Sequence, residues 1–185
     1  MSNAVLLVDD EAGVLKALQR VLTMEGYVVH LAGSGEEALE ILQTRKFKVI
    51  ISDERMPGMA GSEFLGLASL RHPETVRIML TGHSSIEGAM RAVNEGQIYR
   101  FLLKPWNDAE LRLAVRSAVD FFDLQRKNRQ LLTLVRSQAL RLRHAERRQP
   151  GITLPERQED GSFLIEEPSE EEIADLLGQC RDGIC

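Results

Sequence analysis

Val49-Ile50-Ile51-Ser52-Asp53 is a mainly apolar run that ends in a reactive polar residue, and it is one of four such runs in this 185-residue chain. The other three are Val5-Leu6-Leu7-Val8 before Asp9-Asp10, Ile78-Met79-Leu80 before Thr81, and Phe101-Leu102-Leu103 before Lys104. Continuous runs of Val, Ile and Leu are typical of strands that are covered by helices on both faces. In open parallel sheets the functional side chains lie at the carboxyl ends of the strands, so we expect these polar residues to meet in one crevice.

The first 120 residues alternate between strand and helix patterns. The candidate strands are 5–8, 27–32, 48–52, 77–80 and 100–103. Three pairs between them have the spacing of a helix capping box: Ser34 with Glu37, Ser84 with Glu87, and Asn107 with Glu110. Gly26 marks the expected end of the first helix. Five βα units of this kind predict a doubly wound α/β fold, in which a five-stranded parallel sheet lies between helices.

The polar residues at the strand ends have a common chemistry. Asp9, Asp10 and Asp53 in one crevice would repel one another unless a cation neutralised them, and Mg²⁺ prefers carboxylates together with water and phosphate oxygens. A carboxylate can also accept a phosphoryl group as an acyl phosphate. Lys104 and Thr81 would then bind the phosphate oxygens. Each side chain alone is equally well explained as a helix cap or a surface residue, but their joint placement indicates a phosphorylation site.

Four motifs contain these strand-end residues. In chain order they are Val8-Asp9-Asp10-Glu11, Ser52-Asp53-Glu54-Arg55-Met56-Pro57-Gly58-Met59, Thr81-Gly82 and Lys104-Pro105. In order and spacing they resemble the receiver domain of two-component response regulators, over about residues 3–122. The resemblance implies a flavodoxin-like fold. It also implies that Asp53 accepts a phosphoryl group from a sensor histidine kinase.

The same resemblance assigns roles to further residues. It implies that Asp10, Asp53 and the backbone carbonyl of Arg55 bind Mg²⁺, with Asp9 acting largely through water. Thr81 and Phe101 correspond to the family's switch pair, in which Thr81 moves to the phosphate and Phe101 turns inward; the alternative for Phe101 is a permanent core aromatic. Phosphorylation adds nearly two negative charges, which would pull Thr81 and Lys104 toward Asp53.

A receiver domain reacts only on itself, so we do not expect an enzyme. The enzymatic alternative is a phosphatase that uses Asp53 as its nucleophile. The haloacid dehalogenase pattern requires a second acid two residues later, where this chain has Arg55. Residues 123–185 carry no Walker loop, no His-Asp metal pair and no helix-turn-helix pattern. We therefore expect the output to pass through a downstream protein partner of unknown identity.

A long helix is expected at the end of the receiver pattern, because no Pro or Gly occurs from Asn107 to about Arg148. Eight positions in it follow 3–4 spacing, and we call them the seam: Phe121, Leu124, Asn128, Leu131, Val135, Gln138, Leu142 and Ala145. Asn128 in such a seam favours a parallel two-stranded coiled coil, hence a homodimer. The alternative is a solvated or frayed amphipathic helix. The predicted domains are a receiver at 1–122, a basic helical extension at 123–149, and an acidic tail at 150–185 that is partly ordered or docks on a partner.

Charge is unevenly distributed along the chain. Residues 1–123 carry a net charge of −4, residues 124–149 carry +7, and residues 150–185 carry −8. Five arginines of the basic segment leave open a DNA- or RNA-binding transcriptional regulator, because clustered cations bind phosphate backbones: Arg136, Arg141, Arg143, Arg147 and Arg148. We do not favour nucleic acid, because the segment lacks aromatic residues for stacking and the acidic neighbour can neutralise it in cis.

The overall composition, 43% hydrophobic and 28% charged, is that of a soluble globular protein. No apolar run approaches the roughly 20 residues that span a bilayer, and the N-terminus does not have the pattern of a secretory signal. We therefore expect a cytoplasmic protein without membrane contact. Cys180 and Cys185 are expected to be exposed thiols, because two cysteines alone make a weak metal signal.

Overall fold

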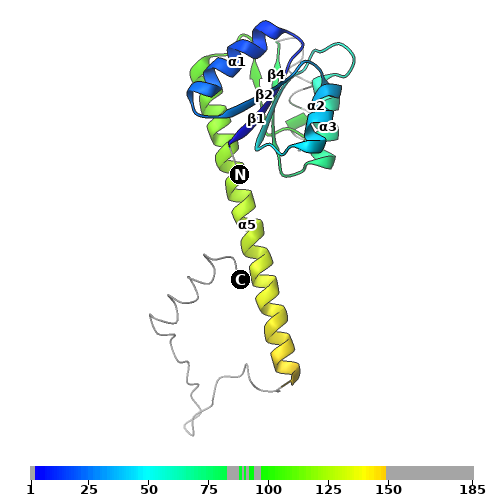
Figure 1. The fold of residues 1–185 in the computed structure, drawn as a ribbon, viewed down its shortest axis with the longest axis vertical. Coiled ribbons are helices and arrows are strands. Elements are labelled where there is room, and N and C mark those ends of the chain that lie inside the picture. Colours follow the sequence, from blue (N-terminus) through cyan, green and yellow to red (C-terminus); the bar gives the residue numbers. More distant parts are fainter. Residues whose placement is uncertain (1–2, 83–87, 89, 91, 94–96, 149–185) are drawn as a thin grey trace. The chain divides into compact units, whose positions relative to one another are not determined.

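The computed structural model describes residues 3–82, 88, 90, 92–93 and 97–148 (Figure 1). The chain divides into two compact units, Met1–Arg126 and Lys127–Cys185. Ser84 and Glu87, predicted as a capping box, lie outside the described residues, as does the whole acidic segment at 150–185. The predicted boundaries at 122 and 149 therefore stay predictions.

The first unit is built on a five-stranded parallel sheet, in the order β2-β1-β3-β4-β5. Its strands are β1 (Ala4–Val8), β2 (Val28–Ala32), β3 (Val49–Asp53), β4 (Val76–Thr81) and β5 (Arg100–Leu103). The five predicted strands are confirmed to within one residue at each end. One difference matters for the site: Asp53 and Thr81 are the last residues of β3 and β4 instead of following them. Their backbones are thus fixed by the sheet.

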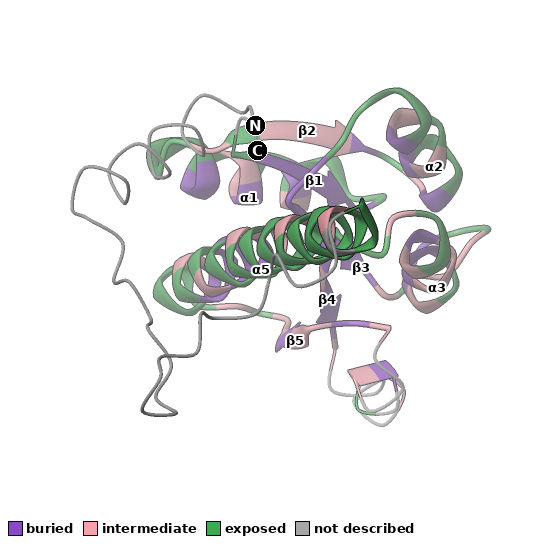
Figure 2. Ribbon diagram, turned by 90° about the horizontal axis from the view of Figure 1, so that it is seen from below, coloured by how far each residue is buried: buried purple, intermediate pink, exposed green. Residues whose placement is uncertain are grey.

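Helices cover both faces of the sheet, as the apolar strands predicted. Figure 2 shows α2 (Gly35–Thr44) and α3 (Gly61–Arg71) on one side, and α1 (Ala12–Met24) with the first part of α5 (Asp108–Arg148) on the other. The side chains of β1 alternate between the two cores. Val5 and Leu7 pack with α1 and α5, while Leu6 and Val8 pack with α2 and α3. The doubly wound α/β architecture is confirmed.

The helix ends follow the sequence signals in part. The Oγ of Ser34 accepts a hydrogen bond from the backbone N–H of Glu37 at 3.2 Å, as a helix N-cap does. The carboxylate of Glu37, however, accepts from the backbone N–H of Gly33 and not from that of Ser34. Asn107 caps α5 through the backbone N–H of Ala109 at 2.8 Å. Gly26 follows α1 with a φ of +82°, a backbone conformation that glycine adopts without strain.

The part of α5 in the second unit confirms that the helix continues to Arg148. Most of its large aliphatic side chains are exposed, including three seam residues: Leu131 at 60%, Val135 at 59% and Leu142 at 58%. Such a row of exposed aliphatic residues stabilises a helix only when another surface covers it. Within the described residues, no helix is both long enough and apolar enough to cross a membrane.

Candidate phosphorylation site

Three of the predicted site residues meet at the carboxyl edge of the sheet. Asp9 follows β1, Asp53 ends β3, and Lys104 follows β5. The ammonium Nζ of Lys104 lies 2.8 Å from Oδ2 of Asp9 and 2.7 Å from Oδ1 of Asp53. Because β1, β3, β4 and β5 are neighbouring parallel strands, their carboxyl ends lie side by side and bring these distant residues together.

The backbone holds the second oxygen of each carboxylate. Oδ1 of Asp9 accepts a hydrogen bond from the N–H of Glu11 at 2.9 Å, and Oδ2 of Asp53 accepts one from the N–H of Arg55 at 3.0 Å. Asp9 is fully buried and Asp53 is 6% exposed. Both carboxylates are therefore fixed in orientation before any ligand arrives.

The charges of this cluster do not balance, since two buried carboxylates share one ammonium. Burial alone would lower the pKa of Lys104. Hydrogen bonds to Asp53 and Asp9, together with the Coulombic attraction of both acids, outweigh that effect and hold the pKa above its ordinary value. Lys104 thus stays protonated at neutral pH, and the cluster keeps an excess negative charge that favours a further cation.

The donors at the site suit a hard cation. Asp10 is adjacent to Asp9, and its side chain is exposed. Among the described residues, no three His, Cys, Asp or Glu side chains are gathered into a metal site. Side chains alone therefore do not assemble the predicted ligand set, which also includes the backbone carbonyl of Arg55. Carboxylate, carbonyl and water oxygens are nevertheless the ligands that Mg²⁺ takes, and the uncompensated charge of Asp9 and Asp53 fits such an ion.

The two predicted switch residues lie on the neighbouring strands. Thr81 is fully buried, and its hydroxyl donates to the backbone carbonyl of Gly82 at 3.3 Å. Its own carbonyl accepts a hydrogen bond from the N–H of Lys104 at 2.8 Å, which ties the ends of β4 and β5 together. Phe101 on β5 is partly buried and packs against the core on the α2 and α3 side. It is thus neither fully exposed nor fully enclosed.

Two residues that shape the loop between β3 and α3 were missed by the sequence analysis. A Cβ atom on Gly61 would lie 1.9 Å from the backbone carbonyl oxygen of Asp53, so only glycine fits there. The carboxylate of Glu54 accepts hydrogen bonds from the N–H and the hydroxyl of Ser62, at 2.8 and 3.0 Å, and so holds the start of α3. The two glycines in the run from Met56 to Gly61 are the sequence signal that could have indicated this tight loop.

Comparison with known proteins identifies the family to which residues 5–116 are similar. Residues 5–116 match the response regulator receiver domain family. The hydrogenase transcriptional regulatory protein HoxA of Cupriavidus necator is 42% identical over 121 residues, covering 65% of this chain and 25% of HoxA. A solved structure described as adenylate cyclase from Rhodopirellula baltica has a TM-score of 0.69 at 39% identity, covering 72% of this chain and 98% of that chain.

A second solved structure is the signal receiver domain of an HD domain-containing protein from Pseudomonas fluorescens Pf-5. It has a TM-score of 0.64 at 37% identity, covering 68% of this chain and 93% of that chain. The chain spans about a quarter of the length of the curated relatives it matches. The matched residues 5–116 contain all the strand-end residues described above. The chain therefore belongs to the response regulator receiver domain family, whose members are the switch domains of two-component signalling.

Proposed function

We propose that Asp53 accepts a phosphoryl group from a sensor histidine kinase and thereby switches this domain. The observation that carries the proposal is the ammonium of Lys104, which lies 2.7 Å from Asp53 and 2.8 Å from Asp9. A buried carboxylate beside a fixed cation is placed to react with a phosphoryl group, because the cation attracts the phosphate oxygens and stabilises the charge on them.

Phosphoryl transfer exchanges the P–N bond of the donor for a P–O bond on Asp53. One carboxylate oxygen of Asp53 attacks the phosphorus of a phosphohistidine and forms a new P–O bond. The P–N bond breaks, and the histidine nitrogen leaves with the electron pair and takes up a proton from water. Hydrolysis later breaks the phosphoryl bond with water and regenerates the carboxylate of Asp53 together with inorganic phosphate. Both reactions act on the domain itself, so it is a phosphoacceptor and not an enzyme with a separate substrate.

Receiver domains generally depend on Mg²⁺, and in this chain Asp10, Asp53 and the carbonyl of Arg55 would hold it. Asp9 would contribute largely through water, because its Oδ2 atom is bound by Lys104. When bound, the ion supplies positive charge that offsets the phosphoryl group. Lys104 binds the phosphate oxygens from the β5 side, and the excess negative charge of the cluster supports this division of roles.

Thr81 and Phe101 carry the signal away from Asp53. The hydroxyl of Thr81 exchanges the carbonyl of Gly82 for a phosphate oxygen, which is the stronger acceptor because it is charged. That movement changes the space beside β4, and Phe101 turns inward to fill it. The partial burial of Phe101 supports the proposal, because a partly exposed ring has room to change its orientation.

The seam of α5 joins two copies of the chain, and the pair presents the switch to a downstream protein partner. Four aliphatic seam residues are more than half exposed: Leu124, Leu131, Val135 and Leu142. A second copy of the helix would bury them, as a parallel coiled coil does. A cytoplasmic location is part of the same proposal, because phosphohistidine donors are made from ATP inside the cell.

Chemical labelling tests the proposal directly. Incubation with acetyl phosphate and Mg²⁺ should add one phosphoryl group to the intact protein, measured by mass spectrometry. Hydroxylamine should then release it, because hydroxylamine cleaves acyl phosphates but not phosphate esters of Ser or Thr. A phosphoryl group that resists hydroxylamine would place the modification on another residue and contradict the proposal.

A further inference from the structure

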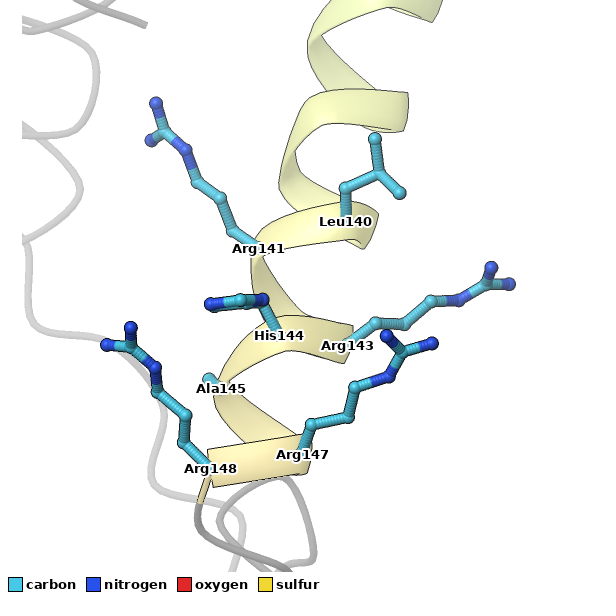
Figure 3. A pocket seen from close by; sticks show the side chains of 7 residues that line it. All are labelled: Leu140, Arg141, Arg143, His144, Ala145, Arg147 and Arg148. Carbon is cyan, nitrogen blue, oxygen red and sulfur yellow. The ribbon is translucent and has the colours of Figure 1, made fainter.

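The last turns of α5 present a basic surface that the receiver chemistry does not use. Figure 3 shows the seven residues that line a shallow, open pocket on this helix: Leu140, Arg141, Arg143, His144, Ala145, Arg147 and Arg148. Arg143 and Arg147 extend to one side of the helix in this view, and Arg141 and Arg148 extend to the other. We call these seven residues the basic face. All except Ala145 are exposed.

Most of the basic face lies outside the seam. Leu142 and Ala145 are the two core positions of the last heptad of the seam. Leu140, Arg143 and Arg147 occupy outer positions of the same heptad pattern, so they face away from a coiled-coil partner. A second copy of α5 would therefore cover the seam and leave these side chains exposed. None of the four arginines of the basic face makes an ion pair with another described residue. A dimer partner would thus leave this surface available to another occupant.

We propose that the acidic segment of this chain, residues 150–185, binds the basic face of α5. The two stretches have nearly opposite charge, +7 for residues 124–149 and −8 for residues 150–185. The acidic segment also mixes acids with aliphatic residues, as in Glu170-Glu171-Glu172-Ile173-Ala174-Asp175-Leu176-Leu177. Acids of this stretch pair with the arginines, and its aliphatic side chains contact Leu140.

The distance along the chain permits this contact. Residues 149–165 form a tether of 17 residues, which spans at most about 60 Å when extended. The helical residues 124–148 extend over about 36 Å. The acids from Glu166 onward can therefore return along the whole basic segment. Because both partners are in one chain, the effective concentration is in the millimolar range, so weak surface ion pairs are sufficient for binding.

A nucleic acid is the competing occupant, because arginines also bind phosphate backbones. The observations favour the acidic segment for two reasons. Residues 124–149 contain no Trp, Tyr or Phe on which bases could stack. A nucleic acid would also have to displace acids that are tethered beside the same surface. The acidic segment is therefore the occupant that we assign to the basic face.

The two cysteines of the chain, Cys180 and Cys185, provide a direct test. A nitroxide label on Cys180 in the full-length Cys185→Ser protein should broaden the backbone amide signals of residues 140–148 in NMR spectra at low salt. Adding salt to 0.5 M should remove most of the broadening, because it screens exposed ion pairs. The triple change Glu170→Gln, Glu171→Gln and Glu172→Gln should remove most of the broadening at low salt, because it removes three of the acids that bind the arginines.

A matched control distinguishes the effect of losing acids in residues 170–172 from the effect of changing the net charge of the protein. The triple change Glu40→Gln, Glu63→Gln and Glu110→Gln removes the same charge from exposed sites elsewhere and should leave the broadening intact. Absent broadening, or broadening that persists in the Glu170–Glu172 variant, would overturn the proposal. A DNA duplex that binds the parent and this variant with equal affinity would also overturn it and assign the basic face to nucleic acid. None of these readouts requires phosphorylation, so the outcome is independent of the role of Asp53.

Discussion

Lys104 Nζ lies 2.7 Å from Oδ1 of Asp53, although β4 lies between β3, which ends at Asp53, and β5, which Lys104 follows. The same ammonium also reaches Asp9, so one cation joins the ends of β1, β3 and β5. This contact places a fixed positive charge beside the proposed acceptor carboxylate and, at the same time, links three strand ends of the fold. Both consequences can be measured separately.

Lys104→Met should lower the free energy of unfolding by about 1–3 kcal/mol, because it leaves buried carboxylates without their donor. Urea unfolding measures this difference, with Lys16→Met at an exposed position as the control, expected within about 0.5 kcal/mol of the parent. Since the pKa of Lys104 is raised in the folded protein, the contribution is complete below the ordinary value of 10.5 and is lost as the pH rises through the folded pKa. Equal stability of the two variants at pH 7 would contradict the role assigned to Lys104.

Mg²⁺ should stabilise the folded domain, because it binds the folded site and not the unfolded chain. The expected gain is about 2.7 kcal/mol when the free ion is at 100 times its Kd, and chelation with EDTA should reverse it. NaCl at equal ionic strength serves as the control. Asp10→Asn should reduce the gain with little structural cost, since the side chain of Asp10 is exposed. A gain that is unchanged in Asp10→Asn would exclude this residue as a ligand.

Gly61→Ala should destabilise the domain by about 1–3 kcal/mol, because the new Cβ atom would lie 1.9 Å from the carbonyl oxygen of Asp53 and the backbone would have to shift. The rate of labelling by acetyl phosphate should fall as well. Gly13→Ala is the matched control: nothing lies within 4 Å of its Cβ position, and it is in a helix, so it should stabilise by about 0.5–1 kcal/mol. A Gly61→Ala protein with parental stability and labelling rate would refute this account of the loop.

Leu131→Asp should convert the proposed dimer to a monomer, because it places a charge in the seam. Light scattering gives the molar mass directly. Leu140→Asp is the control, since Leu140 is as exposed as Leu131, at 65% against 60%, but lies outside the seam. A parent protein with monomeric mass, or a Leu140→Asp variant that dissociates equally, would count against the coiled coil.

The sequence predicted the features that depend on local pattern. Runs of Val, Ile and Leu gave the strands, and the order of Asp9, Asp53, Thr81 and Lys104 along the chain gave the site, because parallel strands bring their ends together without further information. It did not reveal that position 61 must be glycine. That requirement comes from the backbone carbonyl of Asp53, which lies close to Gly61 only in the folded loop.

The sequence also did not indicate the ion pair between Lys48 and Asp123. Lys48 is buried and pairs with Asp123 at 2.6 Å. In the sequence it is an ordinary charged residue at the start of a strand, and nothing nearby indicates that α5 brings it a partner. Charged pairs between distant elements require the tertiary structure, whereas apolar periodicity does not.

Asp53→Asn gives the most direct test of the central claim. Parent and variant are incubated with radiolabelled acetyl phosphate in Mg²⁺, and Asp120→Asn, an exposed carboxylate on α5, serves as the control. We expect labelling of the parent and of Asp120→Asn, and no labelling of Asp53→Asn, because an amide cannot form an acyl phosphate. Persistent labelling of a folded Asp53→Asn protein would show that Asp53 is not the phosphoryl acceptor.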